Sequence, residues 1–157
     1  MPHGDGATSG NRKPASISGR LTSAWLALCG SLALHVFDEA STGFLSVYNP
    51  TVLAARQRFG WFPMPTFRYD VWLSGLIAAV VLLLLLTPLA KARPFRPFMY
   101  LFAVLMLLNG LGHTLGTILG HTLPSIRFAR PMPGFYSSPF LFAASVFMLV
   151  QLRRTAH

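Results

Sequence analysis

The chain has 157 residues, of which 53% are hydrophobic and only 11% are charged, whereas soluble domains carry about 25% charged residues. With a single cysteine, Cys29, this composition excludes a secreted disulfide scaffold, a coiled coil and a fold with a water-facing surface all round. The net charge of +9 does not indicate nucleic-acid binding, because the basic residues lie between long uncharged runs, where a membrane protein meets lipid headgroups.

Residues 1–20 are rich in Gly, Ser, Asn and Pro and show no apolar period, so we expect a disordered tail. The first apolar run follows and is uncharged over residues 21–37. We expect a membrane-spanning helix that continues to about Gly43. A cleaved signal peptide is the competing interpretation, since basic residues precede an uncharged stretch at residues 21–34.

The connection of residues 41–70 carries a helix signal of its own. Asn49 followed by Pro50 predicts an N-cap with proline at the first helical position, and Gly60 predicts the end of the segment. Residues 52–59 mix apolar side chains with two arginines, and tryptophan, phenylalanine and prolines follow, as is typical of the headgroup boundary, so we expect a short interfacial helix between the first two spans. Two interpretations stay open, a lid over the outer mouth of the bundle and a simple anchor.

Three further apolar runs follow, at residues 71–90, 97–120 and 135–152. With the first run they predict an all-α, polytopic membrane four-helix bundle over residues 21–152. Eight basic residues lie on the side that holds both termini and the 91–96 loop, against five on the other side. We therefore expect a multi-pass protein of the cell inner membrane with cytoplasmic termini, including a C-terminal tail at residues 153–157.

Two of the four acidic residues, Asp38 and Glu39, lie side by side near the end of the first run. A charged side chain at membrane depth costs on the order of 2.5–3.5 kcal/mol and usually faces a bundle interior. His35 precedes them at the i, i+3 and i, i+4 spacings, so the three side chains share one helix face. The pattern predicts a polar site within the bundle.

The third run carries two stripes at four-residue spacing, one polar and one of glycine: Asn109, His113, Thr117 and His121; Gly112, Gly116 and Gly120. The glycines allow close helix approach, within the chain or in a homodimer. Counted from residues 21 and 97 at about 1.5 Å per residue, His35 and His113 lie roughly 21 and 24 Å from the cytoplasmic side. We therefore expect the two histidines to meet in the outer half of the bundle.

The His-x-x-Asp-Glu pattern of residues 35–39, the Asn-x-x-x-His of residues 109–113 and the Pro-Gly-x-Tyr of residues 133–136 resemble the HXXEE-domain family of small bacterial integral membrane proteins. The resemblance covers residues 21–152. It departs at Asp38, where the family motif has glutamate, and at Tyr136, which follows the Pro-Gly pair instead of preceding it. It implies an enzymatic membrane protein with no assigned reaction, and it marks His35, Glu39 and His113 as site residues.

Two imidazoles and a carboxylate are the protein ligands of hydrolytic zinc centres and of open non-haem iron sites. His35, Glu39 and His113 supply this set, so we predict a divalent metal, zinc or iron, in an enzyme that acts on a hydrophobic lipid, sterol or isoprenoid. Asp38 would orient a ligand, act as a fourth ligand or serve as general base, and Tyr136 would donate to an oxyanion. Further candidates are Asn109, His121 and Asp70.

Three alternatives stay open. In a metal-independent lipid isomerase, His35 and Glu39 would act as acid and base, and their spacing has a fainter resemblance to emopamil-binding-type sterol isomerases. In a proton or ion relay, or in a binding protein, the same groups would pass on protons or ions or hold a ligand without catalysing a reaction. In a structural role, they would only hold helices together. No cofactor is expected in these metal-free cases.

Overall fold

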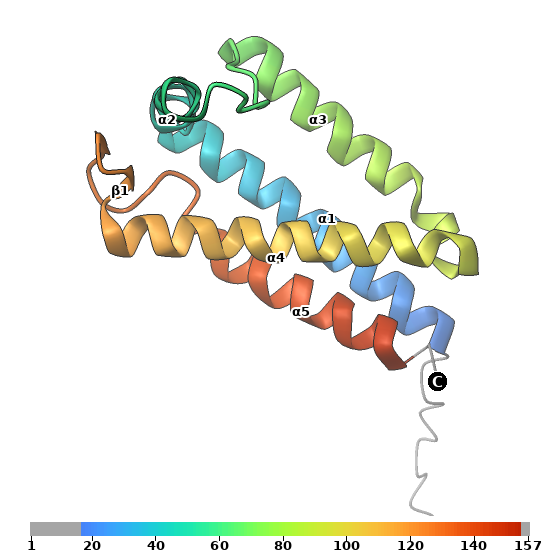
Figure 1. Ribbon diagram of the computed structural model, residues 1–157. Coiled ribbons are helices and arrows are strands. Elements are labelled where there is room, and N and C mark those ends of the chain that lie inside the picture. The colour runs from blue at the N-terminus through green and yellow to red at the C-terminus, as the bar shows by residue number, and fades with distance from the viewer. Residues whose placement is uncertain (1–16, 155–157) are drawn as a thin grey trace, which may run out of the picture.

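The structure is a computed structural model that describes residues 17–154. In this part of the chain it contains five α-helices: α1 (Ile17–Thr42), α2 (Leu45–Phe59), α3 (Tyr69–Leu85), α4 (Arg96–Leu119) and α5 (Ser138–Arg154). Two 3₁₀ turns, η1 (Thr87–Lys91) and η2 (Arg93–Phe95), precede α4, and two short strands, β1 (His121–Leu123) and β2 (Ile126–Arg127), follow it. The protein is therefore mostly helical, as predicted (Figure 1).

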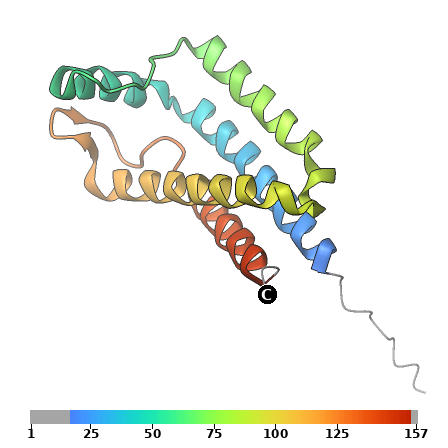
Figure 2. The ribbon, with the colours of Figure 1, turned by 45° about the vertical axis from the view of Figure 1, so that its right-hand side comes forward.

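Helix α1 has a central position among the long helices. It packs against α3 and against α5, and α5 in turn packs against α4. The starts of α1 and α4 and the end of α5 lie at one end of the molecule, whereas α2 and the β1–β2 hairpin lie at the other (Figures 1 and 2). The end of α1 and the end of α4, which carry the predicted site residues, therefore point toward the same end.

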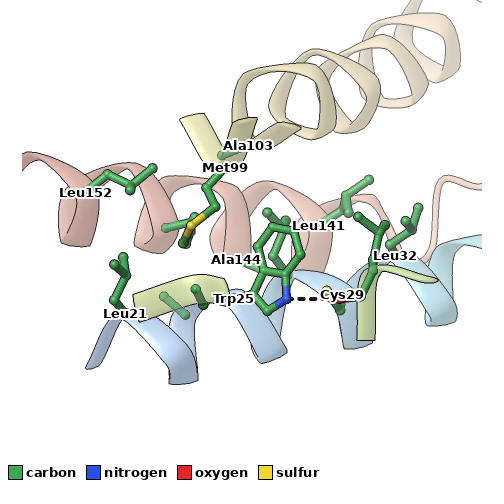
Figure 3. Packing of buried hydrophobic residues seen from close by; sticks show 14 of the residues in the cluster. Leu21, Trp25, Cys29, Leu32, Met99, Ala103, Leu141, Ala144 and Leu152 are labelled. Atoms are coloured by element: carbon green, nitrogen blue, oxygen red, sulfur yellow. Dashed lines mark hydrogen bonds between the residues drawn. The ribbon is translucent and has the colours of Figure 1, made fainter. Parts of the chain in front are cut away.

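One apolar core joins α1, α3, α4 and α5 (Figure 3). At its centre Trp25 of α1 is fully buried, and its ring lies 5.5 Å from that of Phe95 and 5.6 Å from that of Phe102. The indole Nε1 of Trp25 donates a hydrogen bond of 3.1 Å to the carbonyl of Leu83. Leu83 lies in the last turn of α3, where carbonyls lack helical partners. This bond therefore ties the end of α3 to α1.

Two helical segments are long and apolar enough to cross a membrane, Gly19–Thr42 and Arg93–Leu119. They correspond to the first and third predicted spans. Tyr69–Leu85 is a shorter apolar helix. Helix α5 has 17 residues, which gives a length of about 25 Å at 1.5 Å per residue. Two of the four predicted spans therefore have the length and composition of a membrane span on their own.

The predicted boundaries around α1 and α2 need correction. Helix α1 begins at Ile17, so the tail prediction is wrong for residues 17–20, and residues 1–16 lie outside the described residues. Helix α2 begins at Leu45, so Asn49 is no N-cap and Pro50 lies inside the helix. The Asn49 side chain instead donates to the carbonyl of Phe67 at 2.9 Å and accepts from its N–H at 3.0 Å. These two bonds hold the segment that leads into α3.

The prediction of an all-α fold missed the β1–β2 hairpin. Helix α4 ends at Leu119, and Gly120 adopts a φ of 74°, a conformation that favours glycine and ends the helix. His121 therefore lies in β1, so the prediction that it continues the polar stripe of the third helix is wrong. Pro124 and Ser125 form the turn between the strands.

The last helix is shorter at its start than predicted. It begins at Ser138 rather than at residue 135, because a turn at Gly134, with a φ of 85°, precedes it. At the other end α5 includes Arg153 and Arg154, the first two residues of the predicted C-terminal tail. Residues 155–157 lie outside the described residues.

Candidate metal centre

The polar residues of α1 share one buried face. His35, Asp38 and Glu39 expose 1%, 9% and 6% of their surface, as their i, i+3 and i, i+4 spacing predicts. Helix α1 ends at Thr42, the φ of Gly43 that follows is 77°, and the N–H of Phe44 donates to the carbonyl of Glu39 at 3.0 Å. This bond joins the second residue after the helix to a carbonyl of its last turn, which is typical of a Schellman motif. It fixes the turn that carries Glu39.

His113 of α4 meets this face of α1. Only 3% of its surface is exposed, and its ring centroid lies 4.6 Å from that of His35, with the ring planes at 83°. The prediction that the two histidines meet is confirmed. The ring of Phe44, which follows the end of α1, lies 5.5 Å from the His113 ring and encloses it from the α2 side.

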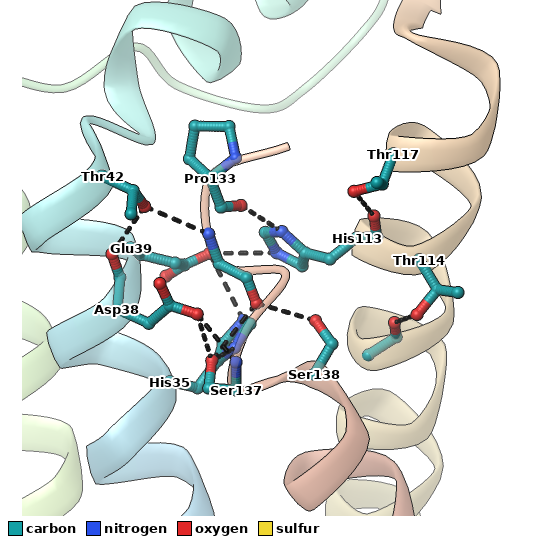
Figure 4. Close-up of polar contacts among 12 residues, drawn as sticks. His35, Asp38, Glu39, Thr42, His113, Thr114, Thr117, Pro133, Ser137 and Ser138 are labelled. Atoms are coloured by element: carbon teal, nitrogen blue, oxygen red, sulfur yellow. Dashed lines mark hydrogen bonds and ion pairs between the residues drawn. The ribbon is translucent and has the colours of Figure 1, made fainter. Parts of the chain in front are cut away.

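The carboxylate of Glu39 lies between the two imidazoles (Figure 4). Its Oε1 is 3.5 Å from Nε2 of His35 and 3.1 Å from Nε2 of His113. Two ligands on one tetrahedral ion with bonds of about 2.0–2.1 Å lie about 3.3 Å apart, close to both distances. One ligand atom from each residue lies within 4.8 Å of the others, so the three residues could hold a metal ion.

The main chain before α5 fixes the tautomer of His113. Nδ1 of His113 lies 2.5 Å from the carbonyl oxygen of Pro133. A carbonyl oxygen can only accept, so Nδ1 carries a hydrogen. In the neutral imidazole the other nitrogen, Nε2, then holds a lone pair. That lone pair is directed at the carboxylate of Glu39.

A second chain of hydrogen bonds fixes His35. Its Nδ1 lies 2.7 Å from the hydroxyl of Ser137, and that hydroxyl donates to Oδ2 of Asp38 at 2.9 Å. The hydroxyl has one proton, and the carboxylate is its strongest acceptor, so Nδ1 of His35 is the donor to Ser137. The N–H of Ser137 also donates to Oδ2 of Asp38, at 2.8 Å. In the neutral imidazole Nε2 of His35 therefore also holds a lone pair.

This order differs from that of a Ser-His-Asp nucleophile. In such a triad the acid holds the histidine, and the histidine takes the serine proton. Here Ser137 lies between His35 and Asp38, and only 2% of it is exposed. Asp38 thus acts through Ser137, which supports an orienting role among the three roles predicted for it.

When both imidazoles are neutral, the result is a buried cluster of three acceptors. Nε2 of His35, Nε2 of His113 and a carboxylate oxygen of Glu39 face one another, and Nε2 of His35 has no hydrogen-bond partner. Such a buried, unsatisfied polar atom costs about 1–3 kcal/mol, and facing lone pairs add repulsion. A cation bound between the three residues removes both penalties. The donor set therefore fits a divalent metal ion.

Gly134 forms the wall of this cluster. Its φ is 85°, and a Cβ atom added there would lie 2.7 Å from Cε1 of His113 and 2.9 Å from Cγ of Glu39. Its N–H donates to the hydroxyl of Thr42 at 3.2 Å. Glycine at this position lets the main chain lie directly against two of the three candidate ligands.

The structure brings only some of the predicted residues to this centre. Asn109 of α4 and His121 of β1 line a pocket beside His113. Tyr136 is 64% exposed and is not one of the three residues that form the cluster. Asp70 forms an exposed ion pair of 3.1 Å with Arg68 and lies away from the cluster.

The glycines of α4 have different neighbours. A Cβ atom at Gly116 would collide with the sulfur of Met132, and one at Gly120 would lie 2.8 Å from Nε of Arg130. The segment before α5 therefore packs on these two glycines, whereas nothing lies within 4 Å at Gly112. The predicted homodimer through this face stays a prediction.

Two pockets flank the cluster. The first has a volume of about 390 Å³, runs along α4 and is mainly apolar, with four polar residues in its wall, Asn109, His113, His121 and Thr122. The second has a volume of about 260 Å³ and lies between α1 and α5, where Asp38, Tyr136 and Ser137 contribute to its wall. The cluster is thus enclosed by protein and borders a pocket through His113 on one side and through the Asp38–Ser137 pair on the other.

Three residues of the site were not identified from the sequence: Pro133, Gly134 and Ser137. Each acts mainly through the main chain or through one short side chain, so residue type alone does not reveal it. The Pro-Gly pair and the two serines ahead of the last apolar run were the available signal.

We expect Ser137→Ala to weaken metal binding by about 10–100-fold, because loss of a residue that orients a histidine ligand typically has this effect. His35 would lose the acceptor for its Nδ1 hydrogen and with it the fixed tautomer. Ser145→Ala is the matched control, since Ser145 is equally buried and its hydroxyl only donates to the carbonyl of Leu141 within α5. Zinc titration with a competing chelator measures both; equal affinities in the two variants would refute the orienting role.

Comparison of the chain with protein-family models, with curated proteins and with solved structures finds no match.

Proposed function

We propose that this protein is an integral membrane enzyme that binds one divalent metal ion, zinc or ferrous iron, through His35, Glu39 and His113 and acts on a hydrophobic substrate. One observation carries the proposal. Nε2 of His35 is buried without a hydrogen-bond partner and faces, with Nε2 of His113, one carboxylate oxygen. A bound metal ion gives all three atoms a partner.

The surface of the long helices supports the membrane placement. Among the described residues thirty large hydrophobic side chains are exposed, most of them on the helices, such as Leu85, Leu101 and Ile118. Exposed apolar area on this scale marks a surface that lipid or another protein covers. Within α3, α4 and α5, residues 71–85, 97–119 and 138–152 contain no aspartate, glutamate, lysine or arginine. We therefore assign α1, α3 with η1, α4 and α5 as four spans in the inner membrane, with cytoplasmic termini.

The chain's own groups prepare the centre for chemistry. Pro133 and Ser137 hold the Nδ1 hydrogens of the two histidines, so both Nε2 atoms are available as ligands. Asp38 holds Ser137 in place. A zinc ion bound there would polarise a carbonyl or activate water, and ferrous iron would add redox chemistry. The pocket beside His113 would bind the apolar part of the substrate, as most small-molecule sites do.

A metal-free acid/base pair is the second candidate, because Nε2 of His113 and Oε1 of Glu39 lie only 3.1 Å apart. If His113 carried two protons, it would donate to Glu39 and form an ion pair. That arrangement supports an isomerase or a proton relay. It leaves Nε2 of His35, at 3.5 Å from Oε1, without a hydrogen bond, so the metal centre accounts for more of the geometry.

A long-chain hydroxamate tests the proposal, because its headgroup binds metal ions and its chain resembles a lipid. In the cobalt-substituted protein we expect dodecanohydroxamate to change the visible absorption spectrum. Gly112→Phe should weaken this binding at least about tenfold, since an aromatic ring placed in the open pocket at Gly112 displaces several methylene groups worth about 0.8 kcal/mol each.

Gly30→Phe is the matched control, because nothing lies within 4 Å of a Cβ atom at Gly30, which is outside the pocket. We expect the control to bind the probe as the wild type does, and both variants to retain the metal. Acetohydroxamate, which lacks the chain, should bind all three proteins equally. Equal binding of the long-chain probe to both variants would contradict the assignment of this pocket to the substrate.

A further inference from the structure

We propose that the pocket between η2, the start of α4 and the end of α5 binds the phosphate of an anionic phospholipid headgroup in the cytoplasmic leaflet. The start of α4 and the end of α5, which line the pocket, lie at the end of the molecule opposite to α2 and the β1–β2 hairpin (Figure 2). The inference rests on the proposed membrane placement and does not depend on metal binding.

Three arginine residues from separate elements line this pocket. It has a volume of about 450 Å³ and is lined by Arg93, Arg96 and Arg153, together with Pro97, Tyr100 and Leu152. Arginine presents its donors in a planar fork that matches two oxygens of a phosphate group at once. Three such side chains offer more donors than the two oxygens of one carboxylate can use, so they suit the larger set of oxygens of a phosphate group.

Among residues 17–154, no acidic residue compensates the charge of this end of the molecule. The described carboxylates, Asp38, Glu39 and Asp70, lie in the other half of the molecule, two at the metal centre and one with Arg68. Neither Arg93 nor Arg153 forms an ion pair with a described carboxylate. The pocket is therefore strongly positive, as a site for an anionic headgroup requires.

The surroundings of the pocket favour a lipid over a small soluble anion. Tyr100 lies one helical turn after Arg96 and is 45% exposed, and Val150 lies three residues before Arg153 and is also exposed. Leu101 continues the apolar outer surface of α4. A ligand with its phosphate among the arginines would thus have its acyl chains along exposed apolar helix faces. A phospholipid combines these two parts, and inorganic phosphate has only the first.

Native mass spectrometry of the full chain in detergent tests the inference with three probes: phosphatidylglycerol, phosphatidylcholine and inorganic phosphate. We expect tight binding of one phosphatidylglycerol and much weaker binding of the other two. The double variant Arg93→Gln/Arg153→Gln should bind phosphatidylglycerol about 30-fold more weakly, which corresponds to about 1 kcal/mol for each arginine near a charged lipid surface. Arg58→Gln/Arg127→Gln removes the same charge at the other end and should bind normally.

Each other outcome has a definite meaning. Equal weakening in the two double variants would show that net charge and not this pocket attracts the lipid, and would overturn the inference. Saturation by inorganic phosphate at the same concentration would identify a small-anion site instead. Metal content is measured in the same samples: retained metal with lost lipid binding supports the inference, and loss of metal from the wild type would refute the proposed function alone.

Discussion

Glu39→Gln is expected to abolish metal binding and, at the same time, to make the metal-free protein more stable than the metal-free wild type. The first effect follows because glutamine removes the charge and the anionic oxygen from a centre with three protein ligands. We expect at least about a 100-fold loss of zinc affinity. Elemental mass spectrometry and zinc titration of the purified variant measure it.

The second effect follows from the lone pairs of the two histidines. In the wild type, Nε2 of His35 and Nε2 of His113 face the same carboxylate oxygen. A glutamine amide has two N–H donors and can supply one to each nitrogen. Relief of the unsatisfied acceptors is worth about 1–3 kcal/mol, which corresponds to a rise of roughly 2–4 °C in the unfolding midpoint per kcal/mol.

The sign of this change separates the two candidate functions. If His113 were doubly protonated and paired with Glu39, the substitution would break a buried ion pair and destabilise the protein by about 3–5 kcal/mol. Thermal unfolding in detergent with a strong chelator compares the two proteins. Asp70→Asn is the control, since Asp70 is an exposed acid paired with Arg68, and it should change neither metal content nor stability appreciably.

Gly134→Ala has the second large expected effect, a loss of about 2–5 kcal/mol of folding free energy together with weakened metal binding. The φ of 85° costs a residue with a side chain about 1–2 kcal/mol. The added methyl group would lie 2.7–2.9 Å from atoms of His113 and Glu39, so the ligands must shift, which adds about 1–3 kcal/mol. Thermal unfolding and zinc titration of the variant measure the two effects.

Two other glycines separate the contributions. At Gly43 the φ is 77°, but the nearest atom to an added Cβ is 4.0 Å away, so Gly43→Ala should show only the backbone cost and keep its metal affinity. At Gly30 of α1 nothing lies within 4 Å, and alanine should be neutral or slightly stabilising. If Gly134→Ala matched Gly43→Ala in both measurements, Gly134 would have no special relation to the ligands.

The cluster of candidate ligands could be predicted from the sequence because each step needed only helix geometry. The i, i+4 spacing places His35 and Glu39 on one face of any helix. The distance of His113 from the start of its own run gave its depth, and the histidine rings do lie 4.6 Å apart. The rise per residue and the helix face on which a side chain lies depend on the local backbone alone. The packing of the helices was therefore not needed for this prediction.

The orienting residues could not be predicted in this way. Ser137 and Pro133 reach the histidines from a turn, and the path of a turn depends on the contacts it makes with the rest of the molecule. The same limit explains the errors at Asn49 and His121. The N-cap preference of Asn49 was outweighed by its two bonds to Phe67, and Gly120 ended α4 before His121. Local propensity is a weak guide where tertiary contacts compete with it.

The metal content of the wild-type protein tests the central claim most directly. The chain is purified in detergent without a polyhistidine tag from cells supplied with zinc and iron, and zinc, iron, manganese and copper per chain are measured by elemental mass spectrometry. A three-ligand centre predicts about one zinc or iron ion per chain. Folded protein that contains none of these metals in stoichiometric amount would contradict the metal centre at His35, Glu39 and His113.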